Sequence, residues 1–268
     1  MKVASLRPAE LSDWLVAHGR HFVTNDEIAE LVGVRASEVR HSLRRQREAN
    51  AIVPVTKGAW VPVPPPYRRN GAPPVEHFID PLMGFLGHYY YIGFLSAAAL
   101  HGASHQAPMV FQVVTDAMLR DRPIGRQQVA FIRRAETRRR ATIRRAVPTG
   151  RVNISTPEVT ILDLCEAPLQ GGGLSNVATV TASLLDSELI DSTALAEQAA
   201  RYPVAVTQRV GYLAEQMGSA VDRPLDLDPL CALVAGAAPV ELYPSAARSG
   251  ERDGRWNVTV NIEIEPDL

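Results

Sequence analysis

The stretch from Arg35 to Arg47 concentrates positive charge, with five arginines and one acidic residue, Glu38. An arginine side chain can donate two hydrogen bonds to O6 and N7 of guanine, or it can bind phosphate oxygens. Val39 and Leu43 recur here at helical spacing, so a helix that buries them turns its polar residues outward. A Thr-Lys-Gly turn follows and carries a further cation. The predicted DNA-binding residues of this region are Arg35, Ser37, Arg40, His41, Arg44, Arg45 and Lys57.

The elements that must hold this surface follow in a characteristic order. A first helix is indicated by apolar residues around Trp14, and a capping box of Thr24 and Glu27 opens a second helix that Gly33 ends. A third helix over residues 36–49 and a hairpin over residues 52–63 complete the region. This order predicts a winged helix-turn-helix over residues 1–63. A solvated basic helix and a winged helix used for protein contacts remain the alternatives. Charge, helix order and hairpin together favour DNA binding.

A second arginine-rich segment runs from Arg120 to Arg151, with 11 arginines and only two acidic residues. Strands are expected over residues 129–134 and 141–147, and we expect them to form a hairpin. Adjacent strand residues point to opposite faces, so the arginine pairs would place charge on both sides of this ribbon. The predicted tip residues, which would bind DNA phosphates, are Arg138, Arg139 and Arg140. The alternative is an edge that its charge protects from aggregation.

Six prolines within residues 62–74 predict a stiff linker over residues 64–75. The larger domain, residues 76–268, is expected to begin with an apolar helix over residues 89–102. A strand over residues 110–115 and a helix that starts at Thr156-Pro157-Glu158 come next. Further helices are expected over residues 174–186, 192–201, 204–217 and 229–235, and a final strand over residues 256–264. The predicted fold class is α+β, with the winged helix followed by a larger mixed α/β domain.

Paired carboxylates near the end of the chain raise the question of an enzyme. Glu263 and Glu265 alternate on the final predicted strand, and such a pair can hold Mg²⁺ in a nuclease. The chain has no lysine after Val75 to complete that site, and solvent-facing charges are the commoner interpretation. A metal-dependent nuclease that its winged helix targets to DNA is the alternative function.

Two weaker patterns also lack a feature that their function would require. His101 and His105 have the spacing of two zinc ligands on a helix, but Gly102 between them is expected to end that helix. Three glycines at positions 171–173 precede a helix without the lysine of a phosphate-binding loop. The sequence therefore predicts no enzyme, catalytic residue, metal site or cofactor.

Charge is divided unevenly along the 268 residues, although the net charge is only −1. Residues 1–151 carry 22 Lys and Arg against 12 Asp and Glu, whereas residues 152–268 carry 6 against 17. The net charges of +10 and −11 predict an anionic partner for the first part. Two cysteines exclude a disulfide framework and fit buried free thiols. No signal peptide or apolar run long enough for a membrane is recognised, so we expect a cytoplasmic protein without a membrane partner.

Several short motifs occur in an order that resembles the AbiEi-type antitoxins. After the Lys-Gly-Ala-Trp turn at Lys57–Trp60 come Ile92–Gly102, with Gly-Phe-Leu-Ser-Ala and Leu-His-Gly, and then Thr-Pro-Glu with Leu162-Asp163. Gly211-Tyr212-Leu213 and a Trp-x-Val-x-Val-Asn segment over residues 256–261 complete the series. No single motif is specific, but their order and spacing are. The family usually has arginine where this chain has Val159, so a function of that arginine would be missing here.

The resemblance implies a transcriptional autorepressor encoded in a toxin–antitoxin or abortive-infection operon. Such a protein binds inverted repeats in double-stranded DNA of its own promoter. It neutralises a nucleotidyltransferase toxin encoded next to it, a functional partner with or without stable contact. The resemblance assigns most DNA binding to the N-terminal domain, and antitoxicity and cooperative binding to the larger domain.

Overall fold

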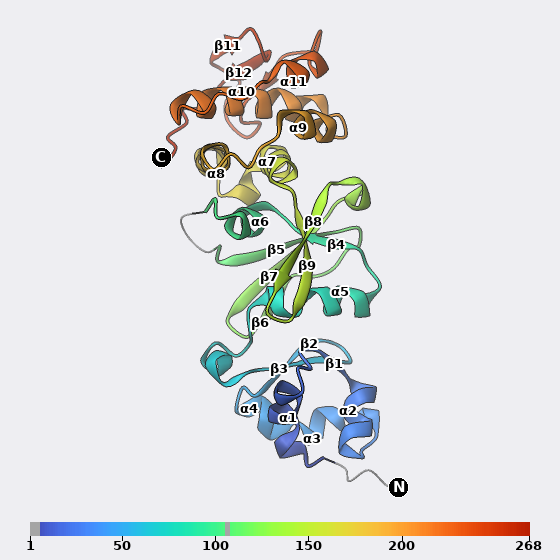
Figure 1. Ribbon diagram of the computed structural model, residues 1–268. Coiled ribbons are helices and arrows are strands. Elements are labelled where there is room, and N and C mark those ends of the chain that lie inside the picture. Colours follow the sequence, from blue (N-terminus) through green and yellow to red (C-terminus); the bar gives the residue numbers. More distant parts are fainter. Residues whose placement is uncertain (1–5, 105–107) are drawn as a thin grey trace. The chain divides into compact units, whose positions relative to one another are not determined.

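The structure is a computed structural model that describes residues 6–104 and 108–268 (Figure 1). The chain divides into two compact units, each made of several segments. Unit 1 comprises Met1–Tyr91, Met109–Thr137 and Arg144–Asn153, and unit 2 comprises Ile92–Pro108, Arg138–Ile143 and Ile154–Leu268. The predicted boundaries at residues 63 and 75 do not coincide with this division, and the three-part domain organisation stays a prediction.

The N-terminal region of unit 1, residues 6–63, has the predicted order of elements. Its helices are α1 (Leu11–Ala17), α2 (Asn25–Val32), α3 (Val39–Ser42) and α4 (Arg44–Glu48). Its strands are β1 (Val23–Thr24), β2 (Ile52–Thr56) and β3 (Ala59–Pro62). They form an antiparallel sheet in the order β1-β3-β2, in which β2 and β3 are the predicted hairpin.

Local sequence signals account for the ends of α2, and burial accounts for its packing. The amide of Glu27 donates to Oγ1 of Thr24 at 3.3 Å, and the amide of Thr24 donates to the Glu27 carboxylate at 2.7 Å. This is the expected capping box, and Gly33 ends the helix with φ +74°. Val39 and Leu43 are fully buried in a core that also contains Leu11, Leu15, Val23, Ile28, Ile52 and Trp60. That burial turns the basic side of α3 and α4 to the solvent.

The predicted third helix over residues 36–49 is wrong as one continuous element. A 3₁₀ turn over Ala36–Glu38 precedes α3, and α4 starts only after Leu43. Leu43 has φ −88° and ψ 5°, values outside the α-helical range, while its amide still donates to the carbonyl of Val39 at 3.0 Å. Backbone hydrogen bonds therefore continue through this buried leucine, although its ψ angle leaves the α-helical range. Spacing alone could not reveal a break at one residue.

The proline-rich segment is folded and attached, not an extended spacer. Pro65–Asn70 forms a 3₁₀ helix that Gly71 ends with φ +74°. The amide of Arg126 donates to the carbonyl of Asn70 at 2.9 Å, and the side chain of Gln127 donates to the carbonyl of Pro73 at 2.8 Å. A Cβ atom on Gly125 would lie 2.5 Å from the Asn70 oxygen. The segment therefore packs against the turn between β6 (Arg122–Ile124) and β7 (Gln127–Arg133).

Replacing Gly125 with alanine tests this close approach. Gly125 has φ +61°, and the atoms that its Cβ would meet are backbone atoms, which cannot swing away. Gly87 is the matched control, because it has φ +74° and a Cβ atom there would meet nothing within 4 Å in the described part of the chain. We expect Gly125→Ala to lower the free energy of unfolding by about 3 kcal/mol, and Gly87→Ala by about 1 kcal/mol. Urea denaturation measures both. Equal losses would contradict the packing of residues 64–75 on the β6–β7 turn.

A six-stranded mixed sheet has the order β6-β7-β5-β4-β9-β8. The remaining strands are β4 (Tyr90–Ile92), β5 (Val110–Thr115), β8 (Thr142–Val147) and β9 (Gly150–Ser155). β5 and β7 are parallel over their whole length, from Val110 opposite Gln128 to Thr115 opposite Arg133. β6 runs antiparallel to β7, and helix α5 (Ile79–Leu86) also belongs to unit 1.

Two predictions about the strands are wrong. The arginine-rich strands β7 and β8 form no hairpin, because β7 lies between β5 and β6 while β8 is the edge strand beside β9. Exposed residues along β8 suit an edge, whereas β7 buries Val129 and Phe131. The predicted helix over residues 89–102 begins instead with strand β4, and α6 covers Phe94–His101. A short apolar run does not distinguish a buried strand from a buried helix.

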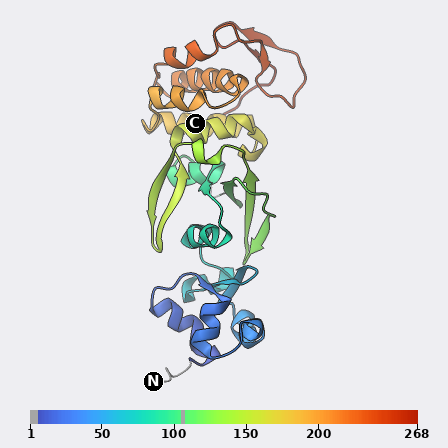
Figure 2. The ribbon, with the colours of Figure 1, turned by 90° about the vertical axis from the view of Figure 1, so that its right-hand side faces the viewer.

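Unit 2 contains the helices predicted after residue 156. After α6 come α7 (Pro157–Glu166), α8 (Leu174–Asp186), α9 (Ser192–Ala199), α10 (Val204–Ala220) and α11 (Asp228–Leu233). Helix α10 packs against α7, α8 and α11 (Figure 2). A small sheet of β10 (Val240–Glu241), β12 (Val258–Val260) and β11 (Glu251–Asp253) follows, in that order. The structure confirms the α+β class.

The final strand is shorter than predicted, because β12 covers only Val258–Val260 of residues 256–264. Trp256 precedes it and is fully buried, with its indole N–H donating to the carboxylate of Glu215 at 2.7 Å. A Cβ atom on Gly211 would lie 2.1 Å from the Trp256 ring. The Gly-Tyr-Leu motif and the Trp-x-Val motif are thus the two sides of one contact between α10 and the end of the chain.

Candidate nucleic-acid interface

All predicted DNA-binding residues of the N-terminal region lie on its outside. Arg35, Ser37, Arg40, His41, Arg44, Arg45 and Lys57 are exposed, opposite the buried Val39 and Leu43. Two of the arginines have acidic neighbours: Arg35 pairs with Glu38, and Nε of Arg44 lies 3.8 Å from the Glu48 carboxylate. Both pairs are exposed, so they contribute little to stability and can exchange for a stronger anion. Arg40, Arg45 and Lys57 make no ion pair with another residue that the structure describes.

The exposed face continues into a hollow of about 650 Å³, which we call the basic groove. Its walls come from α2, α3, the β2–β3 hairpin and the segment that leads into β6. Four cationic side chains line it, with no acidic side chain among the lining residues: Arg40, Lys57, Arg120 and Arg122. The other lining residues are Asn25, Pro54, Val55, Thr56, Gly58, Trp60 and Pro123. Arg120 and Arg122 were not predicted from the sequence as neighbours of the N-terminal region. Their only signal was membership in the arginine-rich segment, which was assigned to a hairpin.

The predicted arginine tip has a different setting from the one expected. Thr137–Arg139 is a 3₁₀ turn, and Arg138 and Arg139 are exposed. The Arg140 guanidinium lies 3.4 Å from the centroid of the Tyr202 ring and donates to the carbonyl of Arg201 at 3.0 Å. Arg140 therefore contributes to packing in unit 2. Its place at the tip of a hairpin is wrong, because the hairpin is absent from the described sheet.

We expect Arg140→Ala to lower the stability of the protein by about 1–2 kcal/mol, since it removes a cation–π contact together with a hydrogen bond. Arg151 is an exposed arginine of β9 and serves as the control, for which a loss below about 0.5 kcal/mol is expected. Guanidinium denaturation measures both variants. If Arg140→Ala keeps full stability but binds DNA less tightly, Arg140 is a DNA contact and not a packing residue.

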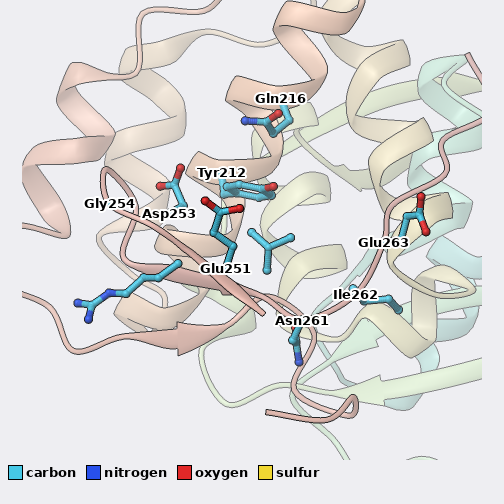
Figure 3. Close-up of a pocket in the computed structure, with 10 residues that line it drawn as sticks. Tyr212, Gln216, Glu251, Asp253, Gly254, Asn261, Ile262 and Glu263 are labelled. Atoms are coloured by element: carbon cyan, nitrogen blue, oxygen red, sulfur yellow. The ribbon is translucent and has the colours of Figure 1, made fainter. Parts of the chain in front are cut away.

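The carboxylates of the nuclease alternative do not share a strand face. Glu263 and Glu265 lie beyond the end of β12, and the amide of Glu265 donates to the Ser175 hydroxyl at 3.2 Å. Glu263 lines a hollow of about 690 Å³ in unit 2 with Glu251 and Asp253. In Figure 3 the latter two lie near the Tyr212 ring, whereas Glu263 lies apart from them. Within residues 6–104 and 108–268, no three His, Cys, Asp or Glu side chains gather as metal ligands.

The other candidate patterns are part of the packing. Nε2 of His101 lies 2.8 Å from the carbonyl oxygen of Ser155, to which it donates, and Gly102 ends α6 with φ +82°. His105 lies outside the described residues.

The glycine run and the cysteines are also explained by packing. A Cβ atom on Gly171 would lie 2.7 Å from Val177, so this glycine permits close packing. Cys165 is buried, and burial raises the pKa of its thiol to about 12, which keeps it protonated at neutral pH. Cys231 is only half-buried.

The motif residues around α7 form hydrogen bonds inside unit 2. Thr156 caps the helix through the amide of Val159, as predicted, and the hydroxyls of Ser155 and Thr160 lie 2.7 Å apart. The hydroxyl of Tyr202 donates to the buried carboxylate of Asp163 at 2.9 Å. A buried polar group without a partner is costly, so these bonds make the motif a requirement of folding.

No helix among the described residues is both long and apolar enough to cross a bilayer.

Comparison with known proteins agrees with the motif order. Residues 91–216 match the family described as the AbiEi antitoxin C-terminal domain. A similar solved structure is the crystal structure of the RV2827C protein from Mycobacterium tuberculosis. It aligns with a TM-score of 0.64 and 16% sequence identity, over 93% of this chain and 89% of that one. This likeness shows a shared fold. No curated protein matches the sequence. The matched domain covers the motifs from α6 to α10, and the match identifies this part of the chain as an AbiEi antitoxin C-terminal domain.

Proposed function

We propose that this chain is the antitoxin of a toxin–antitoxin system and also a DNA-binding autorepressor, which binds inverted repeats in its own promoter. The observation that carries the proposal is the exposed basic face of α3 and α4, together with the basic groove beside it. The elements of the N-terminal region have the order of a winged helix-turn-helix, in which the third helical segment enters the major groove.

The proposed contacts divide into two classes. Arg40, Arg44 and Arg45 project from the third helical segment, so they are placed to contact base edges or the flanking phosphates. Lys57 at the tip of the hairpin is placed to contact a phosphate or a neighbouring minor groove. Arg35, Ser37 and His41 extend the same face. Of the other predicted residues, Arg138 and Arg139 remain proposed phosphate contacts by their exposure, whereas the packing of Arg140 favours a structural role.

We propose that the toxin is a nucleotidyltransferase encoded next to this chain, as the resemblance implies, and that the antitoxin acts in the cytoplasm. We propose that the chain acts by binding; Glu263 and Glu265, the carboxylates that suggested a nuclease, lie beyond the end of β12. The purified antitoxin and toxin test whether neutralisation needs a stable contact between them. A gel shift of the purified protein on its own upstream region tests the DNA-binding half.

Two single variants test the proposed recognition face. We expect Arg40→Ala and Arg44→Ala each to weaken binding to the operator by about 1–3 kcal/mol where a base contact is lost, with relaxed specificity at one position. If the lost contact is to a phosphate, all sequences weaken alike and the salt slope falls by about one. The control is Arg248→Ala, an arginine of unit 2 whose side chain is 88% exposed. Fluorescence anisotropy over a salt series measures all three. Unchanged binding by both variants of the face would remove the recognition assignment.

Repression and antitoxicity should separate by point substitution. We expect the double variant Arg40→Ala/Arg44→Ala to lose repression of a promoter reporter and yet protect cells from the toxin, because both arginines are exposed and lie outside the antitoxin domain. A fragment that starts near Val75 is a poorer test, since it would remove the segment that packs on the β6–β7 turn. Loss of protection by a double variant that is folded and abundant would show that antitoxicity depends on DNA binding.

A further inference from the structure

We infer that Arg120 is a DNA-phosphate ligand, and that the segment before β6 completes the DNA-binding surface through the basic groove. This inference rests on the proposed function, because it extends the contact from the third helical segment and hairpin to a part of the chain some sixty residues later. The ligand class is the phosphodiester backbone of duplex DNA beside the recognised major groove.

The groove brings together cations from three separate places in the sequence. Arg40 comes from α3, Lys57 from the β2–β3 turn, and Arg120 and Arg122 from the segment that enters β6. Arg40 belongs both to the recognition face and to the wall of the groove, so the two surfaces are continuous. A row of cations without an acidic neighbour in the lining attracts the phosphates of a backbone without regard to base sequence.

Contacts to the β2–β3 hairpin and to β7 hold the Arg120 segment in place. Nη1 of Arg122 donates to the carbonyl of Val55 on β2 at 3.1 Å, and its guanidinium lies 5.1 Å from the centroid of the Phe131 ring. The amide of Phe131 in turn donates to the Asp121 carboxylate at 2.8 Å. Burial lowers the pKa of Arg122, which marks it as a partly desolvated cation. Arg122 is thus engaged inside unit 1, and its exposed neighbour Arg120 is the one placed to meet a ligand.

Attachment of the segment at a second point makes the groove a preformed surface. The β6–β7 turn carries Gly125, which packs on Asn70 and Gly71 at the end of the proline-rich segment. The N-terminal region and the Arg120 segment are therefore connected on both sides of β6, in one compact unit. Preorganisation matters here, since a cation on a mobile loop would lose entropy when it bound a phosphate.

The test compares an arginine of the segment before β6 with an arginine of the β6–β7 turn. Arg120→Gln removes a charge from the groove, whereas Arg126→Gln removes a charge that is also exposed but does not line it. Affinity is measured by fluorescence anisotropy on a duplex of the chain's own upstream region and on a random duplex of equal length, over a salt series. We expect Arg120→Gln to weaken binding to both duplexes about tenfold and to reduce the salt slope by about one. Arg126→Gln should match the wild type.

A charge-retaining variant and an anion control complete the design. Arg120→Lys is expected to restore the salt slope, which a loss of folding would not allow. Inorganic phosphate added at constant ionic strength should not compete with the duplex; competition at that ionic strength would identify a site for the free anion and overturn the assignment to DNA.

The outcomes separate the two claims. If Arg120→Gln and Arg126→Gln bind alike while Arg40→Ala binds weakly, the inference about Arg120 is wrong and the proposed function stands. If the wild type binds neither duplex, both the inference and the proposed function are wrong.

Discussion

The close approach of Gly125 to the backbone of Asn70 and Gly71 is the contact on which the basic groove of unit 1 depends. It leaves no room for a side chain, and the hydrogen bond from Arg126 to Asn70 closes it. Because of this contact, the proline-rich segment is part of a packed unit and not a tether. Cations that lie far apart in the sequence then line one groove, as Arg40 and Arg120 do. A flexible linker could not have kept such a surface in place, because chain entropy would oppose it.

The antitoxin domain is organised on a different principle. Its motif residues are mostly internal: Asp163 accepts from Tyr202, and Gly211 leaves space for the Trp256 ring. Such residues specify a fold, since a buried carboxylate or hydroxyl needs a partner and a buried ring needs a matching cavity. The motifs that identify the domain therefore consist mainly of residues that pack its interior.

Net charge is a poor guide to the partner of this chain. The value of −1 for the whole sequence conceals +10 in residues 1–151 and −11 in the rest. A charged partner responds to the local field, and four cations line the basic groove without an acidic lining residue. Other arginines of the segment from Arg120 to Arg151 lie in different surroundings: Arg144 pairs with Asp80 at 2.9 Å, and Arg140 stacks on Tyr202.

The sequence by itself determined what depends on neighbours along the chain. The capping box at Thr24 and the Thr156 cap are interactions within one turn, and the helix over Leu174–Asp186 follows from local periodicity. Only the tertiary structure decided which strands pair, because pairing depends on register and burial between distant segments. It separated the strands around Arg138 and brought Arg120 to the hairpin that carries Lys57. The residues near Arg120 in the sequence do not indicate that it lies beside the β2–β3 hairpin, since only folding brings these two segments together.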